Sequence, residues 1–275
     1  MGRGSGFGKV ILFGEHFVVH GVPGIVSAID STVDAEVKKI VEGMTVKDER
    51  KGAKGYTEKK EAQQKESIER MLKTMGIDPE KASLEIWLGG NLPAFSGIGA
   101  SAASSVAIAK ATAEEFEMEL SDEKINEIAY EAEKAYAGTP SGIDNTAATY
   151  GGLIWFKRNL SGGSDTIEKL SIRKPVEIVI GNTGIVADTK EMVAGVAKRK
   201  RRSPEKYNTL FRKAEELAFT ARKALEEFDL QKVGKLMTEN HGLLQGIEVS
   251  CKELDYLVNL ALKQGAFGAK LTGGG

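Results

Sequence analysis

A glycine- and serine-rich loop runs straight into an alanine-rich helical pattern in the stretch Leu92-Pro93-Ala94-Phe95-Ser96-Gly97-Ile98-Gly99-Ala100-Ser101-Ala102-Ala103-Ser104-Ser105. An apolar run at 84–88 predicts a strand that delivers the chain into this loop. Glycines let the backbone approach an anion, and the first turn of the helix supplies free N–H groups and the positive end of its dipole. The junction is typical of a phosphate-binding site, although a loop that only caps a buried helix has the same composition.

Two common nucleotide signatures do not fit the sequence. A Walker A loop needs Gly-x-x-x-x-Gly-Lys-Ser/Thr, but Arg3 occupies the first glycine position before Gly8-Lys9, and Val10 follows the lysine. The dinucleotide fingerprint needs a third glycine after Gly97-Ile98-Gly99, where Ala102 stands. We therefore expect another route to phosphate binding.

Composition limits the classes of protein that the chain can belong to. The 275 residues are 41% hydrophobic and 28% charged, with a formal net charge of −1, so neither nucleic acid nor a membrane is an expected partner. The basic run at 198–202 falls at a predicted helix end, where solvated cations are favourable. The single cysteine, Cys251, excludes an internal disulfide and suits a reducing compartment, and no signal peptide or membrane-spanning run is present. We expect a cytoplasmic protein.

The order of predicted elements indicates an α+β class, because strands and helices mix without regular βαβ alternation. Hydrophobic patterning predicts strands at 9–13, 17–19, 25–29, 34–41, 84–88, 151–156 and 175–180. It predicts helices at 58–75, 101–116, 125–136, 190–200, 204–228, 230–244 and 252–263. Near Lys174 the pattern changes from mixed strands and helices to long helices, which suggests an N-terminal domain over 1–174 and a C-terminal domain over 175–275.

A second group of chemistry-bearing residues lies at 131–145. A predicted helix ends at Gly138, Pro140 forbids its continuation and Gly142 frees the backbone, so we expect a loop to present Asp144 to a ligand. The alternative for Asp144 is a residue that only caps a turn.

Glu133 lies on the last turns of the same predicted helix. Magnesium prefers oxygen ligands, and phosphates of a substrate complete its octahedron, so Glu133 with the hydroxyl of Ser101 would be a sufficient protein contribution. The alternative for Glu133 is a solvated carboxylate on a helix face.

The third group is Gly8-Lys9-Val10-Ile11-Leu12-Phe13-Gly14-Glu15-His16, where a lysine opens an apolar strand and a charged pair interrupts it. A lysine beside a transferring phosphoryl group stabilises developing charge, and a nearby aspartate takes the proton of the attacking hydroxyl. Lys9, Asp144, Ser101 and Glu133 make a complete set for phosphoryl transfer. The alternative for His16 is a hydrogen-bonded, partly buried histidine.

These three groups together resemble the GHMP small-molecule kinases over the whole chain. The segments that carry the resemblance are 8–21, which contains Gly-Glu-His-Phe-Val-Val-His-Gly, the loop at 97–102, and 138–145, which reads Gly-Thr-Pro-Ser-Gly-Ile-Asp-Asn. The first and last segments are similar to the branch of the family that acts on mevalonate. The 11 positions from Glu133 to Asp144 match the family's separation of magnesium carboxylate and catalytic aspartate.

The resemblance implies transfer of the γ-phosphoryl group of ATP to the terminal 5-hydroxyl of (R)-mevalonate, with Mg²⁺ as cofactor. Asp144 would be the base, Lys9 would make the hydroxyl more acidic and steady Asp144, and Ser101 with Glu133 would hold the magnesium. Glu15, His16 and Thr189 would contact the mevalonate. The nucleotide would be bound by Pro93, Ser96, Gly97, Ile98, Gly99, Ala100, Ser101, Ala102 and Ala103.

The implied fold has an N-terminal α+β domain with a left-handed crossover and a C-terminal ferredoxin-like domain, and a homodimer would fit the family. Two alternatives stay open. One is a related kinase acting on phosphomevalonate, a sugar or homoserine, and the other is a non-catalytic ligand-binding module on the same fold.

The sequence departs from the usual family pattern in three places. Gly6-Phe7-Gly8 replaces Ala-Pro-Gly, and Gly-Ile-Gly-Ala-Ser replaces Gly-Leu-Gly-Ser-Ser at 97–101; both variants resemble the trypanosomatid-type branch. The segment 268–275 resembles the start of the family's third Gly-rich motif, and the sequence stops inside it. If a strand is missing there, we expect an exposed sheet edge and weakened activity.

Overall fold

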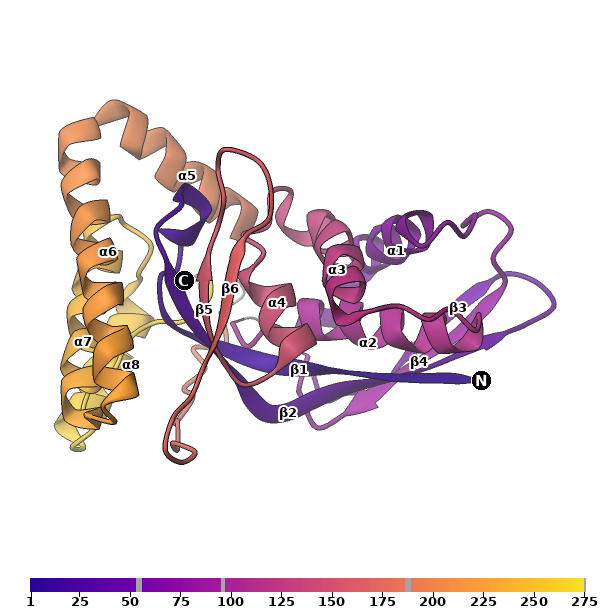
Figure 1. Ribbon diagram of the computed structural model, residues 1–275, viewed down its shortest axis with the longest axis horizontal. Coiled ribbons are helices and arrows are strands. Elements are labelled where there is room, and N and C mark those ends of the chain that lie inside the picture. Colours follow the sequence, from indigo (N-terminus) through magenta and orange to yellow (C-terminus); the bar gives the residue numbers. More distant parts are fainter. Residues whose placement is uncertain (53–55, 95–96, 186–188, 275) are drawn as a thin grey trace. The chain divides into compact units, whose positions relative to one another are not determined.

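The computed structural model describes residues 1–52, 56–94, 97–185 and 189–274, and the chain forms two compact units (Figure 1). The first unit comprises residues 1–9 and 28–151, and the second comprises 10–27 and 152–275. Strands β1 (Gly2–Phe13) and β2 (Gly24–Lys39) each contribute to both units. The domain boundary expected near Lys174 stays a prediction.

The first unit contains a sheet in the order β3-β4-β2, with β1 paired to β2. Strand β4 (Leu84–Gly90) runs antiparallel to residues 33–39 of β2 and parallel to β3 (Met44–Asp48). Alternate residues of β2 in this stretch, Val33, Ala35 and Val37, are buried, as the period of two for a strand requires. Four helices complete the unit: α1 (Tyr56–Thr74), α2 (Ala100–Glu115), α3 (Asp122–Ala137) and α4 (Ile143–Tyr150).

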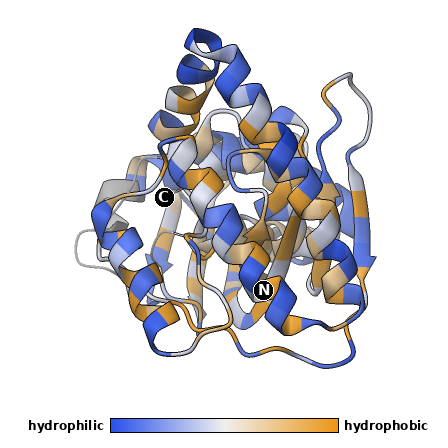
Figure 2. Ribbon diagram, turned by 90° about the vertical axis from the view of Figure 1, so that its left-hand side faces the viewer, coloured by the Kyte–Doolittle hydropathy of each residue, from blue (hydrophilic) through white to orange (hydrophobic). Residues whose placement is uncertain are grey.

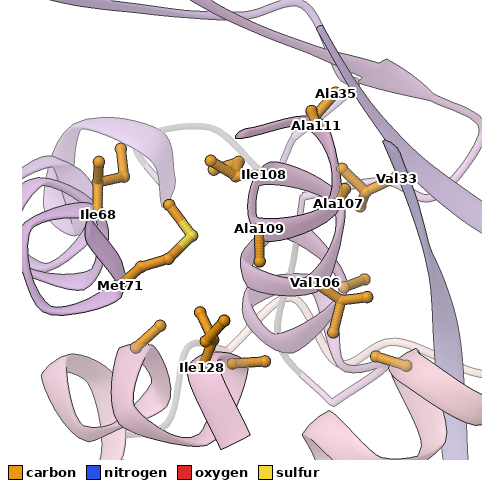
Figure 3. Packing of buried hydrophobic residues seen from close by; sticks show 14 of the residues in the cluster. Val33, Ala35, Ile68, Met71, Val106, Ala107, Ile108, Ala109, Ala111 and Ile128 are labelled. Carbon is orange, nitrogen blue, oxygen red and sulfur yellow. The ribbon is translucent and has the colours of Figure 1, made fainter. Parts of the chain in front are cut away.

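Helix α2 is the centre of this unit's hydrophobic core. Figure 3 shows Ala107 and Ala111 of α2 against Val33 and Ala35 of β2, while other residues of α2 face the neighbouring helices α1 and α3. Nearly every residue of α2 is buried, and its small side chains allow close approach on all sides. The first turn of α2 is thereby held rigidly at the end of the loop.

Strand β1 approaches the backbone of α2 unusually closely. Its alternate residues are glycines, and they lie against α2 alanines four positions apart. A Cβ atom on each glycine would lie only 2.1 to 2.3 Å from an alanine carbonyl oxygen; the pairs are Gly2 with Ala111, Gly4 with Ala107 and Gly6 with Ala103. Two strand residues and four helix residues advance by similar distances, about 6 to 7 Å, so the two small-residue rows stay in step.

The second unit has the strand order β2-β5-β6. Strand β5 (Leu153–Lys157) pairs antiparallel with residues 24–27 of β2 and with β6 (Thr166–Leu170). A short 3-10 helix (Val18–His20) precedes β2, and α5 (Thr189–Arg202), α6 (Pro204–Glu226), α7 (Leu230–Gly246) and α8 (Lys252–Lys263) follow. Helices α6 and α7 run side by side (Figure 1).

Unlike the largely buried α2, the other long helices carry both hydrophilic and hydrophobic residues, which Figure 2 shows interspersed along the ribbons. One cluster of buried side chains in the second unit consists of Phe17, Val22, Val196, Tyr207, Phe211, Ala214, Leu244, Ile247, Val249 and Leu271. The cluster joins the segment after β1 to α5, α6 and α7 and to the C-terminal residues. The α+β class and the long helices predicted from the sequence are confirmed.

Two predicted strands are not strands in the structure. Residues 17–19 enter a 3-10 turn because Gly14 has a φ of 103° and its carbonyl accepts a hydrogen bond from the N–H of Val18 at 2.9 Å. Residues 175–180 pair with no other strand in the described part of the chain, and Val179 is 90% exposed. A run of apolar residues forms a strand only where a neighbour completes its hydrogen bonds.

None of the helices in the described ranges combines the length and the apolar composition that crossing a bilayer requires.

Candidate active site

Lys9 and Asp144 form an ion pair in the first unit. The Lys9 side chain is 2% exposed, and its Nζ lies 2.9 Å from Oδ1 of Asp144, whose side chain is 36% exposed. The N–H of Lys9 also donates to the carbonyl of Ile98 in the glycine-rich loop, at 2.9 Å. A buried ammonium group needs such a counter-ion, and the exposed part of the carboxylate leaves Asp144 open to a ligand. The structure thus brings together the two residues predicted as catalytic.

Asp144 lies in the first turn of α4, so the prediction that a loop presents this residue is wrong. Gly142 caps the helix in the left-handed region at φ 89°, and the Thr146 hydroxyl donates to the Gly142 carbonyl at 2.6 Å. Ile143 and Ala147 are fully buried, so tertiary packing stabilises a helix that its β-branched and polar residues do not favour. A carboxylate at a helix N-terminus is also stabilised by the helix dipole.

Glu133 is a buried carboxylate between two serine hydroxyls. Ser101 donates to its Oε2 at 3.2 Å, and Ser105 donates to its Oε1 at 3.5 Å. Burial, reinforced by the nearby Asp144, raises the pKa of Glu133 to about 8. Because hydroxyls carry no net charge, this carboxylate lacks a hydrogen-bonded counter-ion among the residues that the structure describes.

The glycine-rich loop ends at a helix start whose first N–H groups have no acceptor within the helix. Gly99 caps α2 at φ 75° without a side-chain hydrogen bond, and the first intrahelical bond runs from the N–H of Ala103 to the Gly99 carbonyl. The N–H groups of the first turn, at 100–102, precede that bond and are available to an anion. A Cβ on Gly99 would lie 2.7 Å from Cγ of Lys9, so a glycine is required for the lysine to pass under the loop.

The other residues predicted to bind nucleotide have different environments. Pro93 and Gly97 are half-buried, whereas Ile98 and Ala103 are buried and contribute to packing. Ser96 lies outside the described residues.

The residues predicted to contact the acceptor lie in the second unit, and Glu15 is not exposed there. Its side chain is fully buried; one carboxylate oxygen pairs with Nζ of Lys270, and the other accepts a hydrogen bond from Nδ2 of Asn240 at 3.2 Å. Neither partner was predicted from the sequence. The lysine within the Gly-Ala-Lys-Leu-Thr-Gly-Gly-Gly segment and a polar residue on the apolar face of α7 were the available signals.

His16 is buried, and one of its ring nitrogens has no hydrogen-bond partner among the described residues. Its Nε2 lies 2.9 Å from the carbonyl oxygen of Gly274, which only accepts, so Nε2 carries the proton. Burial lowers the pKa of His16 below its usual value. The buried Nδ1 is then an acceptor, and it finds no donor within the described residues. It is suited to a ligand hydroxyl.

Thr189, the first residue of α5, is exposed and lies beside Gly274. A Cβ on Gly274 would lie 2.8 Å from the Thr189 Oγ1. The structure therefore groups Thr189 with His16 through the C-terminal glycine-rich segment.

The described ranges contain no cluster of three or more His, Cys, Asp or Glu side chains that could hold a metal by themselves. A cation at Ser101 and Glu133 would need further ligands from a bound phosphate group.

Comparison with known proteins defines the class first. Residues 64–152 match the family model of the GHMP kinases N terminal domain, and residues 221–275 match that of the GHMP kinases C terminal domain. The fold described above is therefore that of a GHMP kinase.

Individual relatives show which branch of the GHMP kinases the chain is similar to. The chain is 33% identical to the mevalonate kinase of Pyrococcus horikoshii and 34% identical to that of Pyrococcus furiosus, in each case over 97% of this chain and 84% of the relative. A crystal structure of L. major mevalonate kinase in complex with R-mevalonate superposes with a TM-score of 0.90 at 40% identity, covering 100% of this chain and 84% of that one. The chain belongs to the mevalonate kinase family.

Proposed function

We propose that this chain transfers the γ-phosphoryl group of ATP to the 5-hydroxyl of (R)-mevalonate. The observation that carries the proposal is the ion pair of Lys9 and Asp144, in the same unit as the free N–H groups of α2 and the buried Glu133. A base, a cation and an anion-binding helix start are the parts that phosphoryl transfer requires. Membership of the mevalonate kinase family supports mevalonate as the acceptor.

Asp144 acts as the base in this scheme. The acceptor oxygen forms a bond to the γ-phosphorus, the bond from that phosphorus to the leaving oxygen of ADP breaks, and the hydroxyl proton passes to the Asp144 carboxylate. Lys9 stabilises the negative charge that develops on the oxygens and fixes the orientation of Asp144 through their 2.9 Å contact. Positioning supplies much of the rate enhancement, because the covalent chemistry of phosphoryl transfer is simple.

The free N–H groups at 100–102 bind phosphate oxygens of the nucleotide. Ser101 and Glu133 fit a magnesium ion, because a buried carboxylate whose pKa is raised to about 8 gains most from a nearby cation. Bound magnesium would neutralise charge on the phosphates.

His16 and Thr189 bind the acceptor. With its proton on Nε2, His16 accepts a hydrogen bond from an acceptor hydroxyl through Nδ1. The homodimer and the cytoplasmic location expected from the sequence belong to the proposal as well.

The test is ADP release from Mg-ATP with mevalonate, phosphomevalonate, galactose and homoserine as separate acceptors. We expect turnover with mevalonate alone. Turnover with one of the other acceptors would assign the chain to another small-molecule kinase. ATP binding without turnover on any of them would favour a non-catalytic module.

A further inference from the structure

We infer that Lys270 is a positioning residue of the acceptor site, and that Glu15 acts through Lys270 and does not contact the acceptor. Lys270 belongs to the C-terminal glycine-rich segment, residues 268–274, which has no regular secondary structure. The inference rests on the proposed function, since it concerns how the acceptor residues are held.

The pairing of Lys270 with Glu15 lies in the interior of the second unit. The two side chains are 1% and 0% exposed, respectively. Lys270 Nζ also donates to the carbonyl oxygens of Ile11 at 3.0 Å and Leu271 at 2.5 Å, and Asn240 completes the shell of Glu15. A buried charge pair with its hydrogen bonds satisfied has a single favourable geometry, so it fixes the elements that carry it.

Side chains hold the rest of the segment in the same way. The Thr272 hydroxyl accepts a hydrogen bond from the N–H of Ile11 at 2.9 Å and donates one to the Ile11 carbonyl oxygen at 3.3 Å. One side chain therefore satisfies both backbone groups of a β1 residue. The N–H of Ala269 donates to Thr238 Oγ1 at 3.3 Å, and that of Leu271 donates to His241 Nδ1 at 3.4 Å. These side-chain hydrogen bonds replace the backbone hydrogen bonds that a paired strand would make.

The anchored segment, residues 268–274, determines which ring nitrogen of His16 carries the proton. Its Gly274 carbonyl accepts the proton of His16 Nε2, which leaves Nδ1 as the acceptor, and its backbone lies against Thr189. Glu15 precedes His16 in the chain, yet no face of its carboxylate is exposed to an acceptor. Lys270 pairs with Glu15 and belongs to the segment whose Gly274 contacts His16 and Thr189. The ion pair therefore positions both of these residues.

A double-mutant cycle tests the inference. Glu15→Gln, Lys270→Met and the double variant are compared for kcat, for KM with mevalonate and for KM with ATP, beside Lys252→Met, an exposed lysine, as the control. We expect each single change to raise the mevalonate KM about tenfold or more with little change in the ATP KM, and the double variant to be no worse than the poorer single one. Non-additivity is the signature of one shared interaction.

Single variants leave an unpaired buried charge, so the fold is checked by circular dichroism and thermal unfolding. If one does not fold, the double variant and Thr272→Val, with Thr272→Ser as the conservative rescue, carry the test: a raised mevalonate KM that serine restores supports positioning.

Two kinds of result, one kinetic in either of two forms and one of stability, overturn the inference alone while the wild type turns over mevalonate. One is an effect of Glu15→Gln without an effect of Lys270→Met, or strictly additive effects, as a direct contact would give. The other is a lower melting temperature with an unchanged mevalonate KM. A wild type without mevalonate turnover overturns the proposed function and this inference with it.

Discussion

At the scale of single residues, the proximity of the catalytic candidates was predicted from the sequence, whereas the burial of the acceptor candidate Glu15 was not. Lys9, Asp144, Ser101 and Glu133 were identified by residue type and spacing, and the structure brings them together in one unit. The burial of Glu15 could not be predicted, because its partners Asn240 and Lys270 lie 225 and 255 positions away. Only the tertiary fold creates such pairs.

Replacing Gly99 by alanine should displace Lys9. The new Cβ would meet the Lys9 side chain at 2.7 Å, and φ 75° adds strain of about 1 to 3 kcal/mol for a residue with a side chain. We expect kcat to fall about tenfold or more. Gly43→Ala is the matched control, since Gly43 has a similar φ of 84° with nothing within 4 Å. Equal activity of the two variants would show that the contact with Lys9 is unimportant.

Glu133 should make stability depend on pH. Its pKa rises from 4.5 to about 8 on folding, so the folded protein binds the extra proton, and the free energy of unfolding falls as the pH rises from about 4.5 to about 8. Glu133→Gln should remove this slope, as urea titrations at several pH values would reveal. Glu131→Gln, on the same helix and paired with Lys134, should keep it. A free energy of unfolding that still falls between about pH 6.5 and pH 8 in Glu133→Gln contradicts the assignment.

At the scale of elements, long amphipathic helices were predicted well, and short or exposed elements were missed. Strand β3 is only five residues long and mostly exposed, and its pairing with β4, which supplies its hydrogen bonds, could not be predicted from its own sequence. Helix α4 follows Pro140 and Gly142, which indicate a turn, and it exists because its apolar face is buried. Hydrophobic periodicity indicates that one face of an element is buried. It does not predict contacts with segments that are distant in the sequence.

The glycine row of β1 makes a prediction at the same scale. Gly4→Ala should lower the free energy of unfolding by about 1 to 3 kcal/mol, because its Cβ would lie 2.3 Å from the Ala107 carbonyl oxygen. Gly242→Ala, in helix α7 with nothing within 4 Å, should instead raise it by up to about 1 kcal/mol. Urea unfolding of both variants checks this, and a harmless Gly4→Ala would refute close β1–α2 packing.

At the scale of the whole molecule, all three histidines make the protein sensitive to acid. Burial is the main cause that lowers the pKa of His16, His20 and His241, and that of His20 falls from 6.5 to about 4. The unfolded chain then binds more protons, so the free energy of unfolding should fall as the pH drops from about 6.5 toward about 4. Because Glu133 gives the opposite slope, urea titrations belong in the Glu133→Gln background, where His20→Gln should flatten the profile. An unchanged profile would contradict a His20 whose pKa is lowered on folding.

The central claim is that Asp144 takes the proton of a mevalonate hydroxyl while ATP donates its phosphoryl group. The most direct measurement follows the phosphorylated product by ³¹P NMR, with Mg-ATP and (R)-mevalonate, for the wild type, Asp144→Asn and the exposed control Asp30→Asn. We expect 5-phosphomevalonate from the wild type and the control, with the rate reduced by about a hundredfold or more in Asp144→Asn. Wild-type rates in Asp144→Asn, or no phosphorylated mevalonate from the wild type, would contradict the claim.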